Sequence, residues 1–532
     1  MAKIFYPDFF NDVFGPIMQP GSSGSFAGTS RVGRIARYTL KSEPKRVKIS
    51  FNPSDEHLKS LGNMMDDRAY LGGLQDFATD DIRLFTGHEE ARARGISYEF
   101  SELANDNPYP GSVTFELTGK DGDTANLVAR SIGGGMVRTY EIHGFPLVWN
   151  ADTYAVLLFG KNENEVRAAQ DKVISKYPAL VEETKSKDKL GRSAVLLEFS
   201  EYPEEIVELI GETVEVRILP ALLPVVTRKE RKPQLFKNVE EWRQVAKERN
   251  ISFVQAAIEY EKNFSDWSDD EIWNYFEKIN DILYNQIHSL EKTGYDESLD
   301  TPNLPIYGRW WDRHLKSGNS ISDSLTQHII THAMSTNAKL PGTLIVPGPM
   351  GTGGGYLYSA IDAVREAHGY SHEKVIESLI VAAALGAIAF TNAQASGNSG
   401  CVGESGICCA MASGAITHLA GGDGEQVEHA ASMALQANLG IPCDPIPGGK
   451  EFPCITRTIR AAVTAPLYAD LALSGIDPLI PYHEVLYAIE EHRKNATQKE
   501  LHEGINVAPC AKRCQECFAS VQMGDKLKYE AQ

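Results

Sequence analysis

The sequence has no cysteine before residue 401, no excess of positive charge and no apolar run long enough to cross a membrane. Its 52 basic and 71 acidic residues give a formal net charge of −19, which argues against a nucleic acid or an anionic membrane as the main partner. The longest apolar run, residues 379–390, is shorter than the roughly 20 residues of a spanning helix. The first residues show no secretory signal. We therefore expect a cytoplasmic protein with neither a nucleic-acid nor a membrane partner.

What the chain does have is the composition of a folded protein. Of its 532 residues, 42% are hydrophobic and 23% are charged, which excludes a disordered or fibrous chain. A chain of this length is expected to contain about three or four domains.

The pattern of apolar residues predicts three regions. Residues 1–150 mix strand-like runs (47–51, 112–117 and 125–129) with helical ones, which predicts an α/β (α+β) domain. In residues 151–227 the predicted order is βαββαβ, with strands at 154–159, 180–183, 194–199 and 213–219 and helices at 163–175 and 203–210. This order describes a ferredoxin-like module of the kind found in small regulatory ACT domains.

Residues 235–532 are predicted to form a mainly helical domain. Apolar side chains recur at helical spacing in residues 239–249, 252–264 and 269–290. Later helices, at 379–390, 410–419 and 426–439, are rich in alanine and glycine. Such a composition suits close helix packing around a buried site.

Two glycine- and serine-rich loops stand out in the first region. One covers residues 20–25, and the other, residues 131–135, follows a predicted strand. Glycine allows the backbone to approach a ligand closely, but each loop taken alone favours a plain turn.

The cysteines point to a metal. Eight in a chain of this length are too few for a disulfide scaffold, and clustered thiols in a reducing compartment indicate metal binding. Cys401, Cys443 and Cys454 lie beside or near glycine or proline, so we expect them in loops. Three thiolates suit an iron–sulfur cluster or zinc, and a cubane held by three leaves one iron open as a Lewis acid. The alternative is three unrelated thiols.

The remaining cysteines are expected to have other roles. Cys408 and Cys409 lead into an alanine-rich helix and are predicted to be core residues. The C-terminal group could hold a second metal, cap the open iron or consist of surface thiols; its members are Cys510, Cys514 and Cys517.

Three segments around the first cysteines resemble the bacterial iron–sulfur L-serine dehydratases. They are Ser-Gly-Asn-Ser-Gly-Cys-Val-Gly-Glu at 396–404, Leu-Gly-Ile-Pro-Cys-Asp-Pro at 439–445, and the stretch from Gly-Gly at 448–449 to Pro-Cys-Ile-Thr-Arg at 453–457. The steps of 42 and 11 positions between the cysteines also fit that family. Residues 67–74 and 130–135 resemble, more weakly, the family's smaller domain.

The resemblance implies an oxygen-sensitive lyase of amino-acid degradation with alpha and beta parts in one chain. It implies a [4Fe-4S] cluster on Cys401, Cys443 and Cys454, whose fourth iron binds the hydroxyl of the substrate. The family converts L-serine into an aminoacrylate, which hydrolyses to pyruvate and ammonia. We also expect a homo-oligomer, namely a dimer.

Candidate substrate contacts follow from the resemblance and from the residue types. Residues 349–355 precede a helix and offer backbone N–H groups and a hydroxyl to a carboxylate, although the segment is also read as a helix-packing turn. Arg457 is a candidate partner of the carboxylate or a structural arginine. The full set of substrate-binding candidates is Ser22, Ser23, Arg31, Thr352, Gly353, Gly354, Ser396, Gly397, Asn398 and Arg457, and the catalytic candidates are Ser30 and Asp67.

The sequence departs from the family at two histidines. The stretch that matches the family's Ser-Ser-His-Thr motif, residues 28–33, has no histidine, and Met64 replaces a second one. Arg31 and Arg34 add positive charge there, which favours a substrate with an additional acidic group. The alternative is that both arginines lie on a solvated helix face. Other functions that remain open are desulfidation of L-cysteine and a non-enzymatic sensor whose ACT-like module binds an amino acid.

Overall fold

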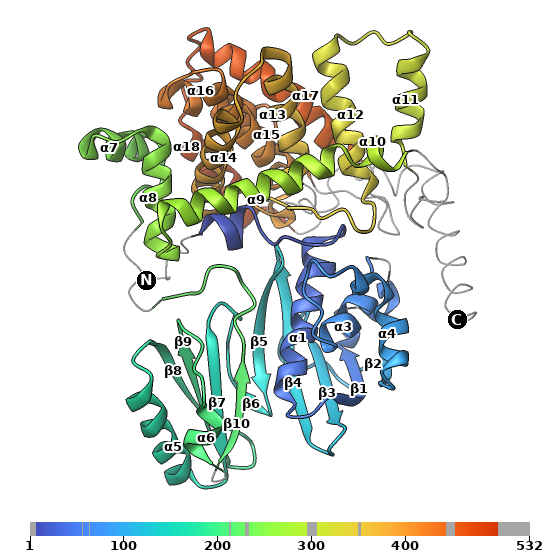
Figure 1. Ribbon diagram of the computed structural model, residues 1–532, viewed down its shortest axis with the longest axis vertical. Coiled ribbons are helices and arrows are strands. Elements are labelled where there is room, and N and C mark those ends of the chain that lie inside the picture. The colour runs from blue at the N-terminus through green and yellow to red at the C-terminus, as the bar shows by residue number, and fades with distance from the viewer. Residues whose placement is uncertain are drawn as a thin grey trace. The chain divides into compact units, whose positions relative to one another are not determined.

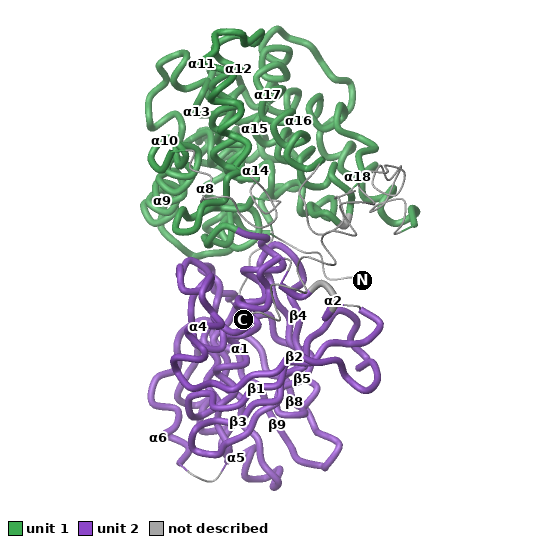
Figure 2. The backbone as a smooth tube through the Cα atoms, turned by 90° about the vertical axis from the view of Figure 1, so that its right-hand side faces the viewer, with its two compact units in different colours: residues 1–20, 233–532 green, residues 21–232 purple. Residues whose placement is uncertain are grey.

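A computed structural model of the chain describes residues 7–55, 57–62, 64–211, 214–228, 234–294, 306–348, 353–442 and 453–497. The chain divides into two compact units (Figure 2). Unit 2 consists of Gly21–Lys232, and unit 1 consists of Met1–Pro20 together with Pro233–Gln532. Cys443, Cys510, Cys514, Cys517 and Thr352 lie outside the described residues.

Unit 2 begins with a six-stranded sheet in the order β2-β1-β3-β4-β5-β6. Strands β1 and β2 are parallel, and all other neighbours pair antiparallel. The elements of this part are η2 (Ser23–Gly28), α1 (Thr29–Thr39), β1 (Pro44–Phe51), η3 (Pro53–Asp55), α2 (His57–Ser60), α3 (Asp66–Leu74), η4 (Ile82–Thr86), α4 (Gly87–Ala93), β2 (Ser97–Glu102), β3 (Val113–Gly119), β4 (Thr124–Gly133), β5 (Met136–Ile142) and β6 (Phe145–Pro146).

Helices α1 and α3 approach each other closely because of glycine. A Cβ atom on Gly73 would lie 1.9 Å from the carbonyl oxygen of Ser30, and one on Gly33 would lie 2.4 Å from that of Tyr70. Any larger side chain at these positions would push the helices apart. The glycines of the 67–74 motif therefore serve helix packing.

The second part of unit 2 is a four-stranded antiparallel sheet in the order β10-β7-β9-β8 (Figure 1). The order along the chain is βαββαβ, as predicted, which is the ferredoxin-like arrangement; whether the module also works like an ACT domain stays a prediction. Its elements are β7 (Tyr154–Gly160), α5 (Glu163–Lys176), β8 (Leu180–Lys187), β9 (Ser193–Phe199), α6 (Ile206–Ile210) and β10 (Glu215–Leu219).

Strand β7 is buried on both faces, which explains its continuous apolar sequence. Val156 and Leu158 point into a core shared with α5 and α6. Leu157 and Phe159 belong to the core of the six-stranded sheet. The two sheets of unit 2 therefore share one hydrophobic core, and the other face of the four-stranded sheet packs on α5 and α6 in a second core.

Unit 1 is helical, as predicted. Among the described residues one helix, α14 (His372–Asn392), is long and apolar enough to cross a membrane, but 83% of its apolar window is buried inside the protein. The other elements are η1 (Phe9–Val13), α7 (Val239–Arg249), α8 (Phe253–Ser265), α9 (Asp269–Ile287), α10 (Ser289–Thr293), α11 (Gly308–Lys316), α12 (Ser324–Ala338), α13 (Gly353–His368), η6 (Gly397–Ser399), η7 (Cys401–Gly403), α15 (Ser405–Leu419), α16 (Gly424–Gln436), α17 (Cys454–Leu473) and α18 (Tyr482–Asn495).

The segment of residues 7–20 belongs to this helical unit, although the sequence placed it with residues 1–150. The ring of Phe9 stacks on Tyr260 with centroids 5.4 Å apart. The Phe9 N–H donates to a carboxylate oxygen of Glu261, 2.7 Å away. These contacts attach η1 to α8.

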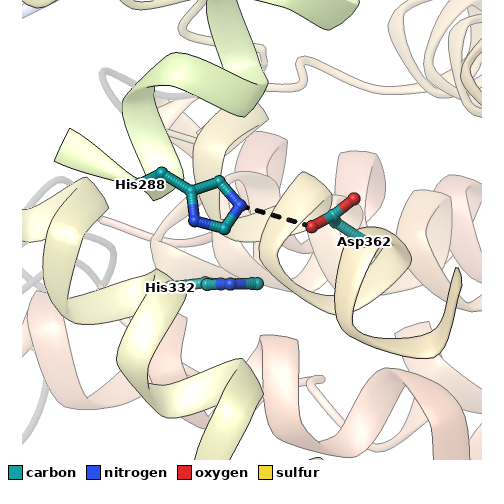
Figure 3. Close-up of side chains that lie close together, drawn as sticks. All are labelled: His288, His332 and Asp362. Carbon is teal, nitrogen blue, oxygen red and sulfur yellow. Dashed lines mark ion pairs between the residues drawn. The ribbon is translucent and has the colours of Figure 1, made fainter. Parts of the chain in front are cut away.

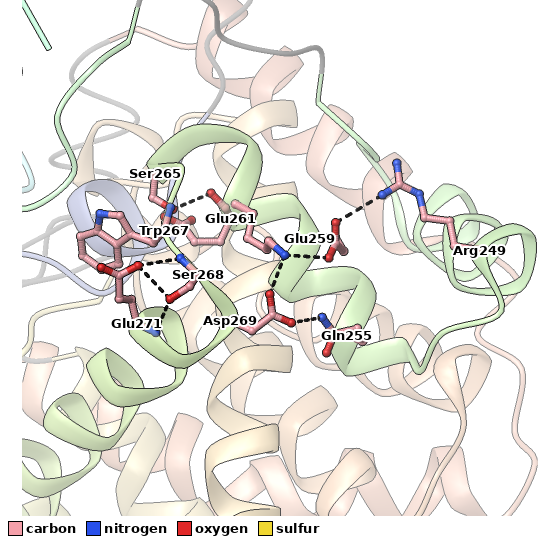
Figure 4. Close-up of polar contacts among 10 residues, drawn as sticks. Arg249, Gln255, Glu259, Glu261, Ser265, Trp267, Ser268, Asp269 and Glu271 are labelled. Carbon is pink, nitrogen blue, oxygen red and sulfur yellow. Dashed lines mark hydrogen bonds and ion pairs between the residues drawn. The ribbon is translucent and has the colours of Figure 1, made fainter.

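Polar contacts fix the corner between α8 and α9 (Figure 4). Ser268 caps α9 by accepting from the N–H of Glu271, whose carboxylate accepts from the N–H of Ser268 in return. Lys262 lies 2.6 Å from Asp269 and 3.2 Å from Glu259. The direction of α9 is thereby set at its beginning.

Candidate active site

Cys401 is a buried thiol at the start of η7. It is 2% exposed, and its Sγ lies 3.1 Å from the hydroxyl oxygen of Ser405. Burial raises the pKa of the Cys401 thiol and the charge of Glu404 adds to that rise, while the hydrogen bond with Ser405 and the guanidinium of Arg457 oppose it. The hydrogen bond and the guanidinium reduce the cost of forming a thiolate at this buried position, which a metal ligand requires.

Cys454 is the first residue of α17 and is half-buried. The N-terminus of a helix carries partial positive charge, which favours a thiolate. The position agrees with the expectation that this cysteine lies at a loop rather than in the middle of a helix.

Two hydrogen bonds join the segments that carry the three predicted ligands. The N–H of Val402, which follows Cys401, donates to the carbonyl oxygen of Ile441 at 3.2 Å. Arg457, on the first turn of α17, donates from Nη1 to the carbonyl oxygen of Pro442 at 2.7 Å. Ile441 and Pro442 directly precede Cys443 in the sequence. The structure therefore brings the surroundings of all three cysteines together.

Cys408 and Cys409 are confirmed as core residues of α15. Both are buried, and the Cys409 thiol donates to the carbonyl oxygen of Ala461 at 3.3 Å. Burial raises the pKa of both thiols. They are consequently poor sources of thiolate.

The predicted loop at 349–355 is described only from Gly353, where α13 begins. The N–H of Gly354 donates to the carbonyl oxygen of Pro347 at 2.8 Å, and a Cβ atom there would lie 2.2 Å from the carbonyl oxygen of Val346. Gly354 therefore serves helix packing, which was the alternative interpretation of this segment.

Residues 396–404 form a tight turn around Cys401. A Cβ atom on Gly403 would lie 2.5 Å from the carbonyl oxygen of Ser396, and one on Gly397 would lie 3.1 Å from the carboxylate of Glu404. The side chain of Asn398 is outside the described part of the chain. The glycines of this motif thus allow the turn that presents Cys401.

In unit 2 the two glycine-rich loops lie against each other. Ser22 caps η2 by accepting from the N–H of Ser25 at 3.1 Å, and Ser23 is buried in the first turn. A Cβ atom on Gly28 would lie 2.1 Å from the hydroxyl oxygen of Ser131. No local sequence pattern predicts that segments so far apart in the chain meet.

Arg31 and Arg34 differ in environment. Arg31 is 3% exposed and donates from Nη1 to the carbonyl oxygen of Gly135 at 2.6 Å, so the alternative of a solvated helix face is wrong for this residue. Arg34 is half-buried and pairs with Asp76 at 2.9 Å. A role of Arg31 in substrate binding stays a prediction.

The two catalytic candidates are also differently placed. Ser30 is fully buried, and its hydroxyl donates to the carbonyl oxygen of Ala27 at 2.9 Å. Asp67 is buried, and its Oδ2 lies 2.8 Å from Nε2 of His88. The neighbouring Asp66 lies 2.7 Å from Nε2 of His57.

Neither histidine was among the residues predicted from the sequence, because the positions that match the family's imidazoles carry other residues. Pairing of His57 and His88 with adjacent aspartates depends on the turn before α3 and on the position of α4, and no local motif signals it. The region therefore does contain imidazoles, at other positions in the chain.

The comparisons with known proteins agree with this arrangement. The family described as "Serine dehydratase alpha chain" matches residues 248–504. The probable L-serine dehydratase alpha chain of Bacillus subtilis (strain 168) is 28% identical over 302 residues, which are 55% of this chain and 98% of that protein.

Other relatives are a beta chain and an L-serine dehydratase of which only part is matched. The probable L-serine dehydratase beta chain of the same organism is 34% identical over 167 residues, which are 31% of this chain and 74% of the beta chain. L-serine dehydratase TdcG of Escherichia coli (strain K12) is 35% identical over 131 residues, 24% of this chain and 29% of that enzyme.

Proposed function

Since the chain belongs to the L-serine dehydratase family, with alpha and beta parts in one polypeptide, and is thus a lyase, we propose that it dehydrates L-serine at a [4Fe-4S] cluster held by Cys401, Cys443 and Cys454. The observation that carries the proposal is the pair of hydrogen bonds, Val402 to Ile441 and Arg457 to Pro442, that joins the cysteine-bearing segments.

The described residues fit such a cluster. Thiolates are the usual protein ligands of iron–sulfur clusters. Cys401 is buried and lies close to a guanidinium group, and Cys454 is at a helix N-terminus. When bound, a cluster with three protein thiolates supplies one iron as a Lewis acid for the leaving hydroxyl group.

Arg457 supports the site in two ways. Its hydrogen bond to Pro442 holds the segment before Cys443 against the helix that begins at Cys454. Its positive charge opposes the rise in the pKa of the Cys401 thiol that burial causes. We infer that Arg457 positions the ligands and stabilises the thiolate, and binding of the substrate carboxylate by the same residue remains a prediction.

The reaction itself requires removal of the α-proton and departure of the hydroxyl group. The resulting aminoacrylate takes up water and yields pyruvate and ammonia in equal amounts. The candidate group for proton transfer is Asp67, whose carboxylate forms a hydrogen bond with His88.

For residues 151–227 we propose a regulatory, ACT-like role. The βαββαβ order and the β10-β7-β9-β8 sheet support this role. The measurement that tests it is the effect of free amino acids on turnover by the whole enzyme.

The experiment that tests the function is a substrate screen with protein purified without oxygen. L-Serine, L-cysteine and β-hydroxy acids with an additional anionic group are compared, and keto acid, ammonia and sulfide are measured. We expect pyruvate and ammonia from L-serine at equal rates. Sulfide from L-cysteine without turnover of serine would show a desulfidase instead. No turnover of any compound by protein with an intact cluster would favour a sensor.

A further inference from the structure

Unit 1 contains a buried cluster of two histidines and an aspartate that the proposed function does not use. His288 follows α9, His332 is on α12, and Asp362 is on α13. His332 and Asp362 are completely buried, and His288 is 8% exposed. One potential ligand atom from each residue lies within 4.8 Å of the other two (Figure 3).

Several buried side-chain atoms of this cluster have no hydrogen-bond partner among the described residues. Neither ring nitrogen of His332 has a hydrogen-bond partner among them. Nε2 of His288 and Oδ2 of Asp362 also lack one, and these two atoms are 3.6 Å apart, which is too far for a hydrogen bond. Buried polar atoms without partners are costly, so the cluster requires a further group.

Two outer contacts orient the potential ligands. Nδ1 of His288 lies 2.8 Å from a carboxylate oxygen of Glu291, which accepts its hydrogen, so in the neutral ring Nε2, on the side of Asp362, is the nitrogen that offers a lone pair. Histidines that bind metals usually donate their other N–H to a carboxylate in this way. Arg365 donates from Nε to Oδ1 of Asp362 at 2.7 Å and fixes the other oxygen toward the cluster.

We propose that His288, His332 and Asp362 bind one divalent transition-metal ion. Two imidazole nitrogens and a carboxylate oxygen are a ligand set for zinc and for ferrous iron. Ligand atoms of a tetrahedral zinc ion lie about 3.4 Å apart. The 3.6 Å between His288 and Asp362 is close to that distance.

The surrounding charges agree with a divalent ion. The cluster contains the carboxylate of Asp362, its direct contacts add the carboxylate of Glu291 and the guanidinium of Arg365, and Arg365 also pairs with the carboxylate of Glu366. With both imidazoles neutral, these groups leave a net charge of minus two, which one divalent ion balances. The ion joins the end of α9 to α12 and α13.

A second set of possible metal ligands, His328, His332 and Glu366, shares His332 with the first and is the alternative site for the ion. His328 precedes His332 by one helical turn, and Glu366 follows Asp362 by one turn, so both pairs lie along facing sides of α12 and α13. His328 and Glu366 are 3.7 Å apart, but His328 is half-exposed. We assign the ion to the inner group because all its members are buried.

The test uses the whole enzyme, purified without oxygen and carrying its cluster. Zinc, iron and sulfide per chain are measured after dialysis against a chelator and titration with Zn²⁺, and the shift of the melting temperature with Zn²⁺ is recorded. We expect one zinc per chain in the wild type. His332→Asn and Asp362→Asn should bind zinc more weakly by at least about 10–100-fold, the cost of losing an outer-shell partner alone, with iron and sulfide unchanged.

Matched variants separate this site from the alternatives. His328→Ala and His418→Ala should keep zinc, because the first is outside the inner group and the second pairs with Glu377 elsewhere in unit 1. Cys401→Ser should also keep it, so loss of the iron–sulfur cluster and loss of this site are distinguishable. The proposal is overturned if the wild type takes up no zinc, or if His328→Ala abolishes binding while His288→Gln does not.

Discussion

Arg457 donates a hydrogen bond from Nη1 to the carbonyl oxygen of Pro442 across 2.7 Å. Pro442 directly precedes Cys443, and Arg457 lies one turn into the helix that starts at Cys454. The contact therefore sets the spacing between two segments that carry proposed cluster ligands.

Replacement of this arginine should weaken cluster binding. In Arg457→Lys the ammonium group cannot reproduce the guanidinium geometry, and loss of a charged hydrogen bond costs about 1.5–3 kcal/mol. We expect iron and sulfide occupancy to fall about tenfold under limiting iron. Arg313→Lys, at an exposed position of α11, is the control and should retain the cluster. Equal occupancy in both variants would contradict the role of Arg457.

Substitutions of the two catalytic candidates, Ser30 and Asp67, should have very different effects on kcat. Ser30→Ala should leave kcat nearly unchanged, because the buried Ser30 hydroxyl already donates to the carbonyl oxygen of Ala27. Asp67→Asn should lower kcat by about 10²-fold or more, since a positioned proton-transfer group contributes about 10²–10⁴. Steady-state rates with L-serine check both. A large loss in Ser30→Ala with an active Asp67→Asn would reverse the assignment.

Helix packing in unit 2 should not tolerate a methyl group at Gly73. A Cβ atom there would lie 1.9 Å from the carbonyl oxygen of Ser30. We expect Gly73→Ala to lower the free energy of unfolding by about 1–3 kcal/mol. Gly160→Ala is the control, because its nearest neighbour, Val166, is at an ordinary 3.6 Å. Urea unfolding measures both, and a Gly73→Ala protein as stable as the wild type would refute the close approach.

His143 should make unit 2 sensitive to acid. Its Nε2 donates to the carbonyl oxygen of Thr39 at 2.9 Å. Burial, together with the charges of Arg217 and Arg192, lowers its pKa from 6.5 to about 4, against smaller opposing effects of the hydrogen bond to Thr39 and of Glu215. Below pH 6.5 the unfolded chain therefore binds a proton that the folded protein does not bind until about pH 4.

Stability should accordingly fall as the pH decreases from 6.5 to 4, by up to about 3 kcal/mol from this residue. His143→Asn keeps an N–H donor, and asparagine tolerates the positive φ of 55° at this position. Between pH 7 and pH 4, the free energy of unfolding of this variant should fall by about that much less than that of the wild type. The measurement is urea unfolding at both pH values, with the exposed His372→Asn as control. The same acid dependence in wild type and His143→Asn would show that His143 is protonated in the folded state.

The sequence predicted the elements of the fold better than their contacts. The helix at 239–249 and the βαββαβ order of residues 154–219 agree with the structure because apolar periodicity follows directly from local geometry. The predicted helix at 269–290 proved to be two, α9 and α10, with His288 between them. Periodicity alone does not reveal such an interruption.

The candidate site was predictable only where spacing carries chemistry. The cysteine motifs indicated a metal because thiols rarely cluster without one, and their neighbours do meet in unit 1. His88 beside Asp67, and His332 beside Asp362, depend on helices from separate parts of the chain. No local pattern encodes those contacts, so they required the structure.

The most direct test of the central claim is the iron and acid-labile sulfide content of Cys401→Ser and Cys454→Ser, measured together with formation of pyruvate from L-serine and compared with Cys408→Ala. The wild type and Cys408→Ala should contain about four iron and four sulfide ions per chain and turn over serine. Both serine variants should lose cluster and activity together. A fully occupied cluster and undiminished pyruvate formation in either serine variant would contradict the account.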